Sequence, residues 1–136
     1  MSDPRNLLLY GAIGAGTLAI LFFSWVPNPN IGLLPIFPAW LGKWTNANGN
    51  LRTAVPFLAL AKMGEICYVG TPNPKQKRTI LFLGLAGVVL VAELGQLFLP
   101  KRHFDWADIG WGLAGTSLGM VAGYGIKQLW ARKSSV

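Results

Sequence analysis

The sequence is poor in the residues that hold metal ions or form disulfides. It contains one cysteine, Cys67, and one histidine, His103, in 136 residues. A single cysteine cannot form an intrachain disulfide, and a single histidine without further ligands argues against the common metal sites. We therefore predict no metal ion and no cofactor, and we expect Cys67 to pack as a small apolar residue.

Charged residues are also scarce, and acidic ones most of all. Only 12% of the residues are charged and 52% are hydrophobic, whereas soluble domains carry about 25% charged residues. Twelve Lys and Arg against five Asp and Glu give a net charge of +7. The cations flank apolar runs, where anionic lipid headgroups could meet them. This pattern predicts a membrane protein with membrane lipids as partners, and no nucleic-acid partner.

The motifs of familiar enzymes are missing as well. The chain has no Gly-rich phosphate loop, no nucleophile-elbow serine, no HExxH pair and no nucleic-acid-binding module. Whether the protein is an enzyme is left open by the sequence.

What the sequence does contain is a series of apolar runs. A membrane-spanning helix needs about 20 mostly apolar residues, and residues 7–26 meet this without a single charge. This run is long enough to span and no clean cleavage site follows it, so we expect a retained helix rather than a signal peptide. Further runs cover residues 51–69, 79–99 and 107–130. The prediction is an all-α polytopic membrane protein, one domain over residues 1–136, with about four transmembrane helices.

The stretch between the first two runs has a different character. Residues 31–44 are apolar, but Pro35 and Pro38 interrupt them, while Trp40 and Trp44 suit a headgroup boundary. We predict an interfacial or partly re-entrant segment there.

The distribution of Lys and Arg predicts the orientation. With the N-terminus inside, the outer side carries four cations: Lys43, Arg52, Lys101 and Arg102. The inner side carries seven: Arg5, Lys75, Lys77, Arg78, Lys127, Arg132 and Lys133. We therefore expect both termini in the cytoplasm. The expected location is a bacterial inner membrane, which the chain crosses several times.

Glycines predict how the last helix packs. Gly112, Gly115, Gly119 and Gly123 fall within residues 107–130, and the last three are spaced by four. Small residues at this spacing share a helix face and let two backbones approach closely in lipid. The last helix is expected to lie at the centre of the bundle.

The densest polar stretch runs from Glu93 to Asp108 and is the candidate site. Glu93 and Gln96 are three residues apart and share a helix face. The other members of the candidate polar site are Arg102, Asp105, Asp108 and, from the second helix, Lys62. The plain alternative is that the aspartates cap the following helix and Arg102 pairs with one of them.

Two partners are open for Lys62. An acid within the membrane normally faces the bundle and has a partner or a function, so we predict a pair between Lys62 and Glu93. Glu65 is the alternative, because it is three residues from Lys62 on the same helix. In either form the pair could serve only to fasten the helices.

The polar stretch carries a family resemblance. Its features are an acid and an amide late in one helix, a Pro-x-Arg link, and two aspartates that open a glycine-bearing helix: Glu93, Gln96, Pro100, Arg102, Asp105, Asp108, Gly115 and Gly119. In these features the chain resembles the VanZ-like family, and more weakly in the 51–69 run, where Asn50 precedes Pro56. Where the family has an asparagine four residues after the second aspartate, this chain has Gly112. The resemblance implies a compact multi-helix membrane protein, and the founding members are associated with glycopeptide, especially teicoplanin, resistance.

Two functional hypotheses follow. In the first, the protein acts in the cell envelope: Arg102 binds an anionic, lipid-linked headgroup and Glu93, Asp105 or Asp108 transfers a proton. It predicts a polar cleft. In the second, the protein is a non-catalytic accessory subunit of a larger membrane complex, such as a respiratory or photosynthetic assembly, with its polar residues mutually satisfied and no accessible pocket. A transporter ranks below both, because the chain shows no clear inverted repeat.

Overall fold

The structure, a computed structural model, describes residues 4–26, 33–67 and 73–135. These ranges form five helices: α1 (Pro4–Ser24), α2 (Ala39–Ala47), α3 (Gly49–Cys67), α4 (Pro74–Gln96) and α5 (Trp106–Ser134). No strand occurs in the described ranges. The predicted all-α fold is therefore confirmed.

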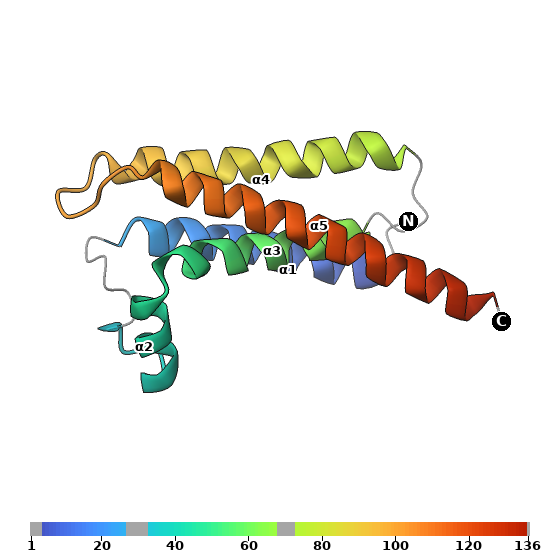
Figure 1. Ribbon diagram of the computed structural model, residues 1–136, viewed down its shortest axis with the longest axis horizontal. Coiled ribbons are helices and arrows are strands. Elements are labelled where there is room, and N and C mark those ends of the chain that lie inside the picture. Colours follow the sequence, from blue (N-terminus) through green and yellow to red (C-terminus); the bar gives the residue numbers. More distant parts are fainter. Residues whose placement is uncertain (1–3, 27–32, 68–72, 136) are drawn as a thin grey trace.

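Four of the helices form a bundle along the long axis of the molecule. α1, α3, α4 and α5 run along this axis in alternating directions, whereas α2 lies crosswise below one end (Figure 1). We call the end at which α1 and α4 finish and α3 and α5 begin the Gln96 end, and the opposite end the Arg78 end. α1 begins and α5 finishes at the Arg78 end (Figure 1).

The buried core lies between α3 and α4. Its buried members are Phe57, Leu60 and Ala61 of α3 and Leu85 and Val89 of α4. Partly buried residues from α1, α4 and α5 pack around them: Ile13, Ile20, Leu81, Val88, Ile109, Leu113 and Met120. α1 contributes little to this core, and its apolar side chains are largely exposed. Such exposure suits a helix that faces lipid.

The glycine face of α5 lies against α3. Gly112, Gly115, Gly119 and Gly123 are all buried. A Cβ added at Gly115 would fall on the backbone carbonyl of Ala54. One added at Gly119 would fall on the carbonyl of Leu58. The two backbones therefore approach more closely than any larger residue would allow.

The helix boundaries differ from the predicted ones mainly in α4. Its start is at Pro74, five residues before the predicted 79, and its end is at Gln96 rather than at 99. Proline is suited to the first helical position because it has no N–H to satisfy there. The preceding Asn73 has a left-handed backbone with φ of 55°. The predicted polar connection is therefore largely helical, and Lys75, Lys77 and Arg78 belong to the first turns of α4.

The other boundaries shift by a few residues. α1 runs over Pro4–Ser24 instead of 7–26, and α3 over Gly49–Cys67 instead of 51–69. α5 reaches Ser134, four residues beyond the predicted 130. Residues 68–69, at the end of the second predicted run, lie outside the described residues.

The segment predicted over 31–44 contains a short helix. Residues 33–37 form turns, and α2 begins after Pro38. Trp40 of this helix is 72% exposed, and α2 does not enter the bundle (Figure 1). An interfacial or partly re-entrant position of this segment therefore remains a prediction. Residues 31 and 32 lie outside the described residues.

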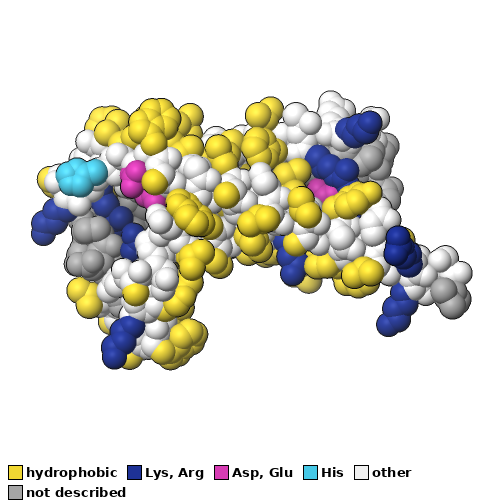
Figure 2. Space-filling model, viewed as in Figure 1, with side chains coloured by type: hydrophobic (Ala, Val, Ile, Leu, Met, Phe, Trp, Pro, Cys, Tyr) yellow, Lys and Arg dark blue, Asp and Glu magenta, His cyan; other side chains and the backbone are white. Residues whose placement is uncertain are grey.

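Among the described residues, two helical segments are long and apolar enough to cross a membrane, by length and composition. They are Leu7–Ser24 in α1 and Lys75–Gln96 in α4. α3 is not among them, and it carries three charged residues, Arg52, Lys62 and Glu65. Most Lys and Arg side chains gather toward the two ends of the long axis, with hydrophobic side chains between them (Figure 2).

Candidate functional site

The candidate site lies at the Gln96 end, where the end of α4, the α4–α5 link and the start of α5 meet. The last turns of α4 supply Glu93 and Gln96, and the link between α4 and α5 supplies Arg102 and Asp105. Asp108 comes from the first turn of α5. The structure thus brings together five of the six residues predicted for the polar site.

Glu93 is buried and holds the α4–α5 link in place. Its side chain is 3% exposed. The Oε1 atom accepts a hydrogen bond from Nε2 of Gln96 at 3.3 Å, and Oε2 accepts one from the backbone N–H of Asp105 at 3.1 Å. Both carboxylate oxygens therefore have donors, as a buried acid requires.

The two aspartates have different partners. Asp105 is the N-cap of α5, and its carboxylate accepts a hydrogen bond from the backbone N–H of Ala107 at 2.8 Å. Asp108 instead accepts a hydrogen bond from the hydroxyl of Thr53 at 3.4 Å. Capping thus accounts for Asp105, whereas Asp108 joins α5 to the first turns of α3.

Arg102 is bonded to the end of α1. Its Nε donates to the carbonyl of Val26 at 2.8 Å, and its Nη2 donates to the carbonyl of Phe23 at 3.1 Å. The last carbonyls of a helix lack partners within the helix and attract a cation. Burial and the nearby charge of Arg52 lower the pKa of Arg102 from its ordinary value, but a guanidinium stays protonated in proteins.

Lys62 lies away from this group. It follows Gly49, the first residue of α3, by 13 positions, which corresponds to about 20 Å along a helix. Glu65 forms an ion pair with Arg78, with 2.6 Å between Oε1 and Nε. Glu93 is bonded to Gln96 and Asp105. Among the described residues, the predicted pair of Lys62 with Glu93 is not formed, since Glu93 lies nearer the Gln96 end, and the alternative partner Glu65 is paired with Arg78 instead.

A cavity of about 500 Å³ opens beside the polar group. Its walls are mainly apolar and come from α1 and α3: Ala12, Gly16, Ala19, Ile20, Phe23, Val55, Pro56, Ala59, Leu60 and Met63. Trp44 and Thr45 of α2 border it. Its polar end is formed by Arg52, Glu93, Gln96, Arg102 and Asp108. Apolar walls with a few polar groups at one end are typical of a site for an amphipathic molecule.

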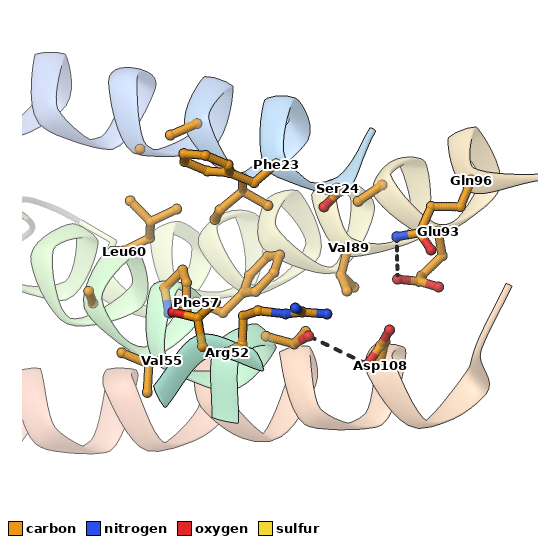
Figure 3. Close-up of a pocket in the computed structure, with 18 of the residues that line it drawn as sticks. Phe23, Ser24, Arg52, Val55, Phe57, Leu60, Val89, Glu93, Gln96 and Asp108 are labelled. Carbon is orange, nitrogen blue, oxygen red and sulfur yellow. Dashed lines mark hydrogen bonds between the residues drawn. The ribbon is translucent and has the colours of Figure 1, made fainter. Parts of the chain in front are cut away.

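Arg52 and Thr53 were not among the predicted site residues. The side chain of Arg52 reaches from α3 toward the end of the cavity where Glu93 and Asp108 lie (Figure 3). The sequence analysis used Arg52 only as one of the four cations on the outer side. Its place at the same membrane boundary as the polar stretch from Glu93 to Asp108 could have indicated that it belongs to the site.

The arrangement is suited to binding by charge and hydrogen bonds. Among the described residues, no group of three or more His, Cys, Asp and Glu side chains could hold a metal ion. His103 is exposed.

Comparisons with protein-family models, curated proteins and solved structures gave no match to this chain.

Proposed function

We propose that the protein is a four-span membrane protein that binds the headgroup of an anionic or lipid-linked molecule in the cavity at the Gln96 end. The observation that carries this proposal is the cavity itself, with an apolar wall on α1 and α3 and a charged end. Of the two hypotheses raised by the sequence, the envelope protein requires such a cleft and the accessory subunit does not.

The four-span arrangement is supported by the bundle. α3 and α5 run beside α1 and α4 along the same axis (Figure 1). The acids of α3 and α4, Glu65 and Glu93, are both turned inward, with exposed fractions of 0% and 3%. Inward acids are expected of membrane-embedded helices. In this arrangement, both termini lie in the cytoplasm and the Gln96 end faces outward.

The headgroup would bind to Arg52 rather than to Arg102. Two of the hydrogen bonds of Arg102 go to backbone carbonyls in the last turn of α1 and just beyond it, whereas the side chain of Arg52 lies along the cavity and points toward Glu93 and Asp108 (Figure 3). A guanidinium matches the geometry of phosphate and carboxylate oxygens. Asp108 lines the same cavity and is the acid best placed to accept a hydrogen bond from a hydroxyl of the ligand.

The acyl or isoprenoid part of such a ligand would lie along α1. The wall there consists of small and apolar residues, including Ala12, Gly16 and Ala19. These residues leave room between α1 and α3 at the level of the lipid chains. A lipid could therefore enter sideways from the bilayer.

The test is to purify the full chain from its native membrane in mild detergent and to identify the bound lipids by mass spectrometry. We expect a stoichiometric anionic or lipid-linked species, reduced roughly tenfold in Arg52→Gln because a charge-assisted contact is lost. Lys43→Gln, an exposed change on α2, is the control and should retain the lipid. Equal lipid retention in wild type and Arg52→Gln would contradict the proposal.

The accessory-subunit hypothesis keeps one supporting observation. Gly11 and Gly14 of α1 have no neighbouring atom within 4 Å of an added Cβ, so a small-residue face of α1 is open to another helix. A partner protein that co-purifies in stoichiometric amount, without a bound lipid, would favour this second function.

A further inference from the structure

A second cleft lies at the Arg78 end and shares no lining residue with the cavity described above. Its volume is about 240 Å³, and it is lined by Glu65, Arg78, Met120, Val121 and Tyr124. These residues come from the end of α3, the start of α4 and the second half of α5.

One oxygen of Glu65 has no hydrogen-bond donor. The side chain is fully buried, with 0% exposure. Its Oε1 accepts from Nε of Arg78 at 2.6 Å, but its Oε2 has no hydrogen-bond partner among the described residues. A buried carboxylate oxygen without a donor is costly and requires an explanation. The unpartnered Oε2 therefore indicates that a hydrogen-bond donor from outside the described residues binds in this cleft.

Gly123 makes room for this carboxylate. A Cβ added at Gly123 would lie 2.8 Å from Cβ of Glu65 and 3.0 Å from its Cγ. Gly123, the last position of the glycine face of α5, thus leaves space for the charged side chain of Glu65. An apolar side chain in place of Glu65 would cost less to bury in a membrane-embedded bundle.

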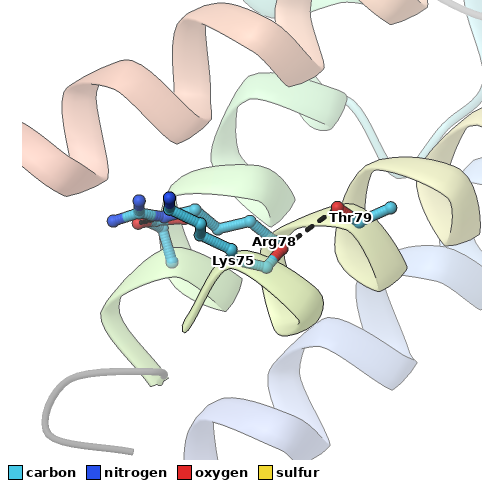
Figure 4. Close-up of polar contacts among 4 residues, drawn as sticks. Lys75, Arg78 and Thr79 are labelled. Carbon is cyan, nitrogen blue, oxygen red and sulfur yellow. Dashed lines mark hydrogen bonds and ion pairs between the residues drawn. The ribbon is translucent and has the colours of Figure 1, made fainter. Parts of the chain in front are cut away.

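Arg78 supplies donors beside the same cleft. Its guanidinium carbon lies 4.7 Å above the ring centre of Tyr124, a contact that fixes the plane of the group. The side chain is 30% exposed, and its hydrogen bond to the described residues uses Nε alone. Its two terminal nitrogens can therefore bind an acceptor. Lys75 reaches in the same direction as Arg78 from the first turn of α4 (Figure 4).

The ligand must therefore accept hydrogen bonds from Arg78 and donate one to Glu65. A phosphate that carries an ammonium group two carbons away satisfies both requirements. Because Glu65 and Arg78 are oppositely charged, a zwitterion of this kind leaves the cleft without an unbalanced charge. Met120 and Val121 line the cleft, and Val121 is 69% exposed, so α5 offers an apolar surface for attached chains.

We propose that this cleft binds one membrane lipid through a phosphoethanolamine headgroup. The phosphate oxygens accept hydrogen bonds from Arg78, and the ammonium donates to Oε2 of Glu65. The site is separate from the cavity at the Gln96 end and does not rest on the function proposed for that cavity.

The experiment is native mass spectrometry of the full chain in detergent, titrated with phosphatidylethanolamine, phosphatidylcholine and phosphatidylglycerol of identical acyl chains. Phosphatidylcholine is the matched control, because it has the same phosphate and charge but no N–H to donate. One charge-assisted hydrogen bond should make phosphatidylethanolamine bind about tenfold more tightly. Equal binding of these two lipids by the wild type, or tightest binding of phosphatidylglycerol, would overturn the proposal.

Two variants then locate the site. Glu65→Gln keeps the shape but puts an amide in place of the carboxylate, so the preference for phosphatidylethanolamine over phosphatidylcholine should disappear. Lys101→Gln, an exposed change at the opposite end of the bundle, should retain it. A preference that survives Glu65→Gln would show that the lipid binds elsewhere. Retention of the Arg52-dependent lipid in Glu65→Gln separates the outcome at this cleft from that at the cavity.

Discussion

The Arg102 guanidinium is bonded to the backbone carbonyl of Val26, with 2.8 Å between Nε and the oxygen. The two residues are 76 positions apart, so this bond ties the α4–α5 link to the end of α1. A second tie lies close by, where Nε1 of Trp25 donates to the carbonyl of Ala92 at 3.1 Å. α1 contributes little to the buried core, so these polar contacts matter for its attachment at the Gln96 end.

The first prediction concerns this tie. Arg102→Lys keeps the charge but replaces the two separate nitrogens that donate to Val26 and Phe23 with one. We expect a loss of about 1.5–3 kcal/mol in the free energy of unfolding, as is typical of hydrogen bonds that involve a charged group. Thermal unfolding in detergent, followed by tryptophan fluorescence, measures the change. Lys101→Arg, at the exposed neighbouring position, should leave the midpoint in place; an unchanged midpoint in Arg102→Lys would show that the tie contributes nothing to stability.

The second prediction concerns the contact between α3 and α5. In Gly115→Ala the new Cβ would fall on the carbonyl of Ala54, and backbone cannot move aside as a flexible side chain can. We expect the helices to separate, with a loss of about 1–3 kcal/mol from overpacking. The same thermal unfolding assay measures it.

Gly125→Ala is the matched control for this change. It lies on the same helix, and a Cβ there has no neighbour within 4 Å. Alanine also favours the helix by up to about 1 kcal/mol relative to glycine, so this variant should be as stable as the wild type or more so. Equal losses in both variants would mean that the glycine face is not a packing surface.

The sequence predicted the helices better than the site. The apolar runs and the glycine spacing are local patterns, so the all-α fold and the α5 face could be read directly. The partners of Glu93 and Glu65 depend on which helix ends meet, and a shift of a few residues in each boundary moves a side chain by several ångströms along the axis. Lys62 was misplaced for this reason. The role of Arg102 could not be predicted, because its acceptors are backbone carbonyls, which no residue pattern marks.

Arg78 also shows why the partner of a buried acid could not be predicted from the sequence. The sequence suggests a polar loop before residue 79, so Arg78 served there only as one of the cations that predict the orientation in the membrane. Once Pro74 starts the helix, the side chain of Arg78 is directed across to α3, where it meets Glu65 at 2.6 Å. The helix start therefore decides the partner of a buried acid on another element.

The third prediction tests the cavity without touching its polar end. Ala19 of α1 lines the cavity wall, and Ala19→Leu would fill part of the space that a ligand chain needs. We expect bound lipid to fall while the fold is retained. Ala15→Leu, one turn earlier on α1 and outside the lining, should keep the lipid. Both variants are compared by quantifying lipid per mole of purified protein, and full retention in Ala19→Leu would place the ligand outside the cavity.

The last prediction tests the four-span arrangement itself. In a Cys67→Ala background, single cysteines are introduced at Lys101 and at Ser135, which are both exposed. If α1, α3, α4 and α5 all cross the bilayer, α5 separates the two positions, and a membrane-impermeant maleimide added to intact cells should label one and spare the other. If only Leu7–Ser24 and Lys75–Gln96 cross, both positions lie on the same side and should react alike. With the cytoplasmic termini indicated by the Lys and Arg distribution, the labelled position is 101, so labelling of 135 alone would reverse the orientation while leaving the four spans intact.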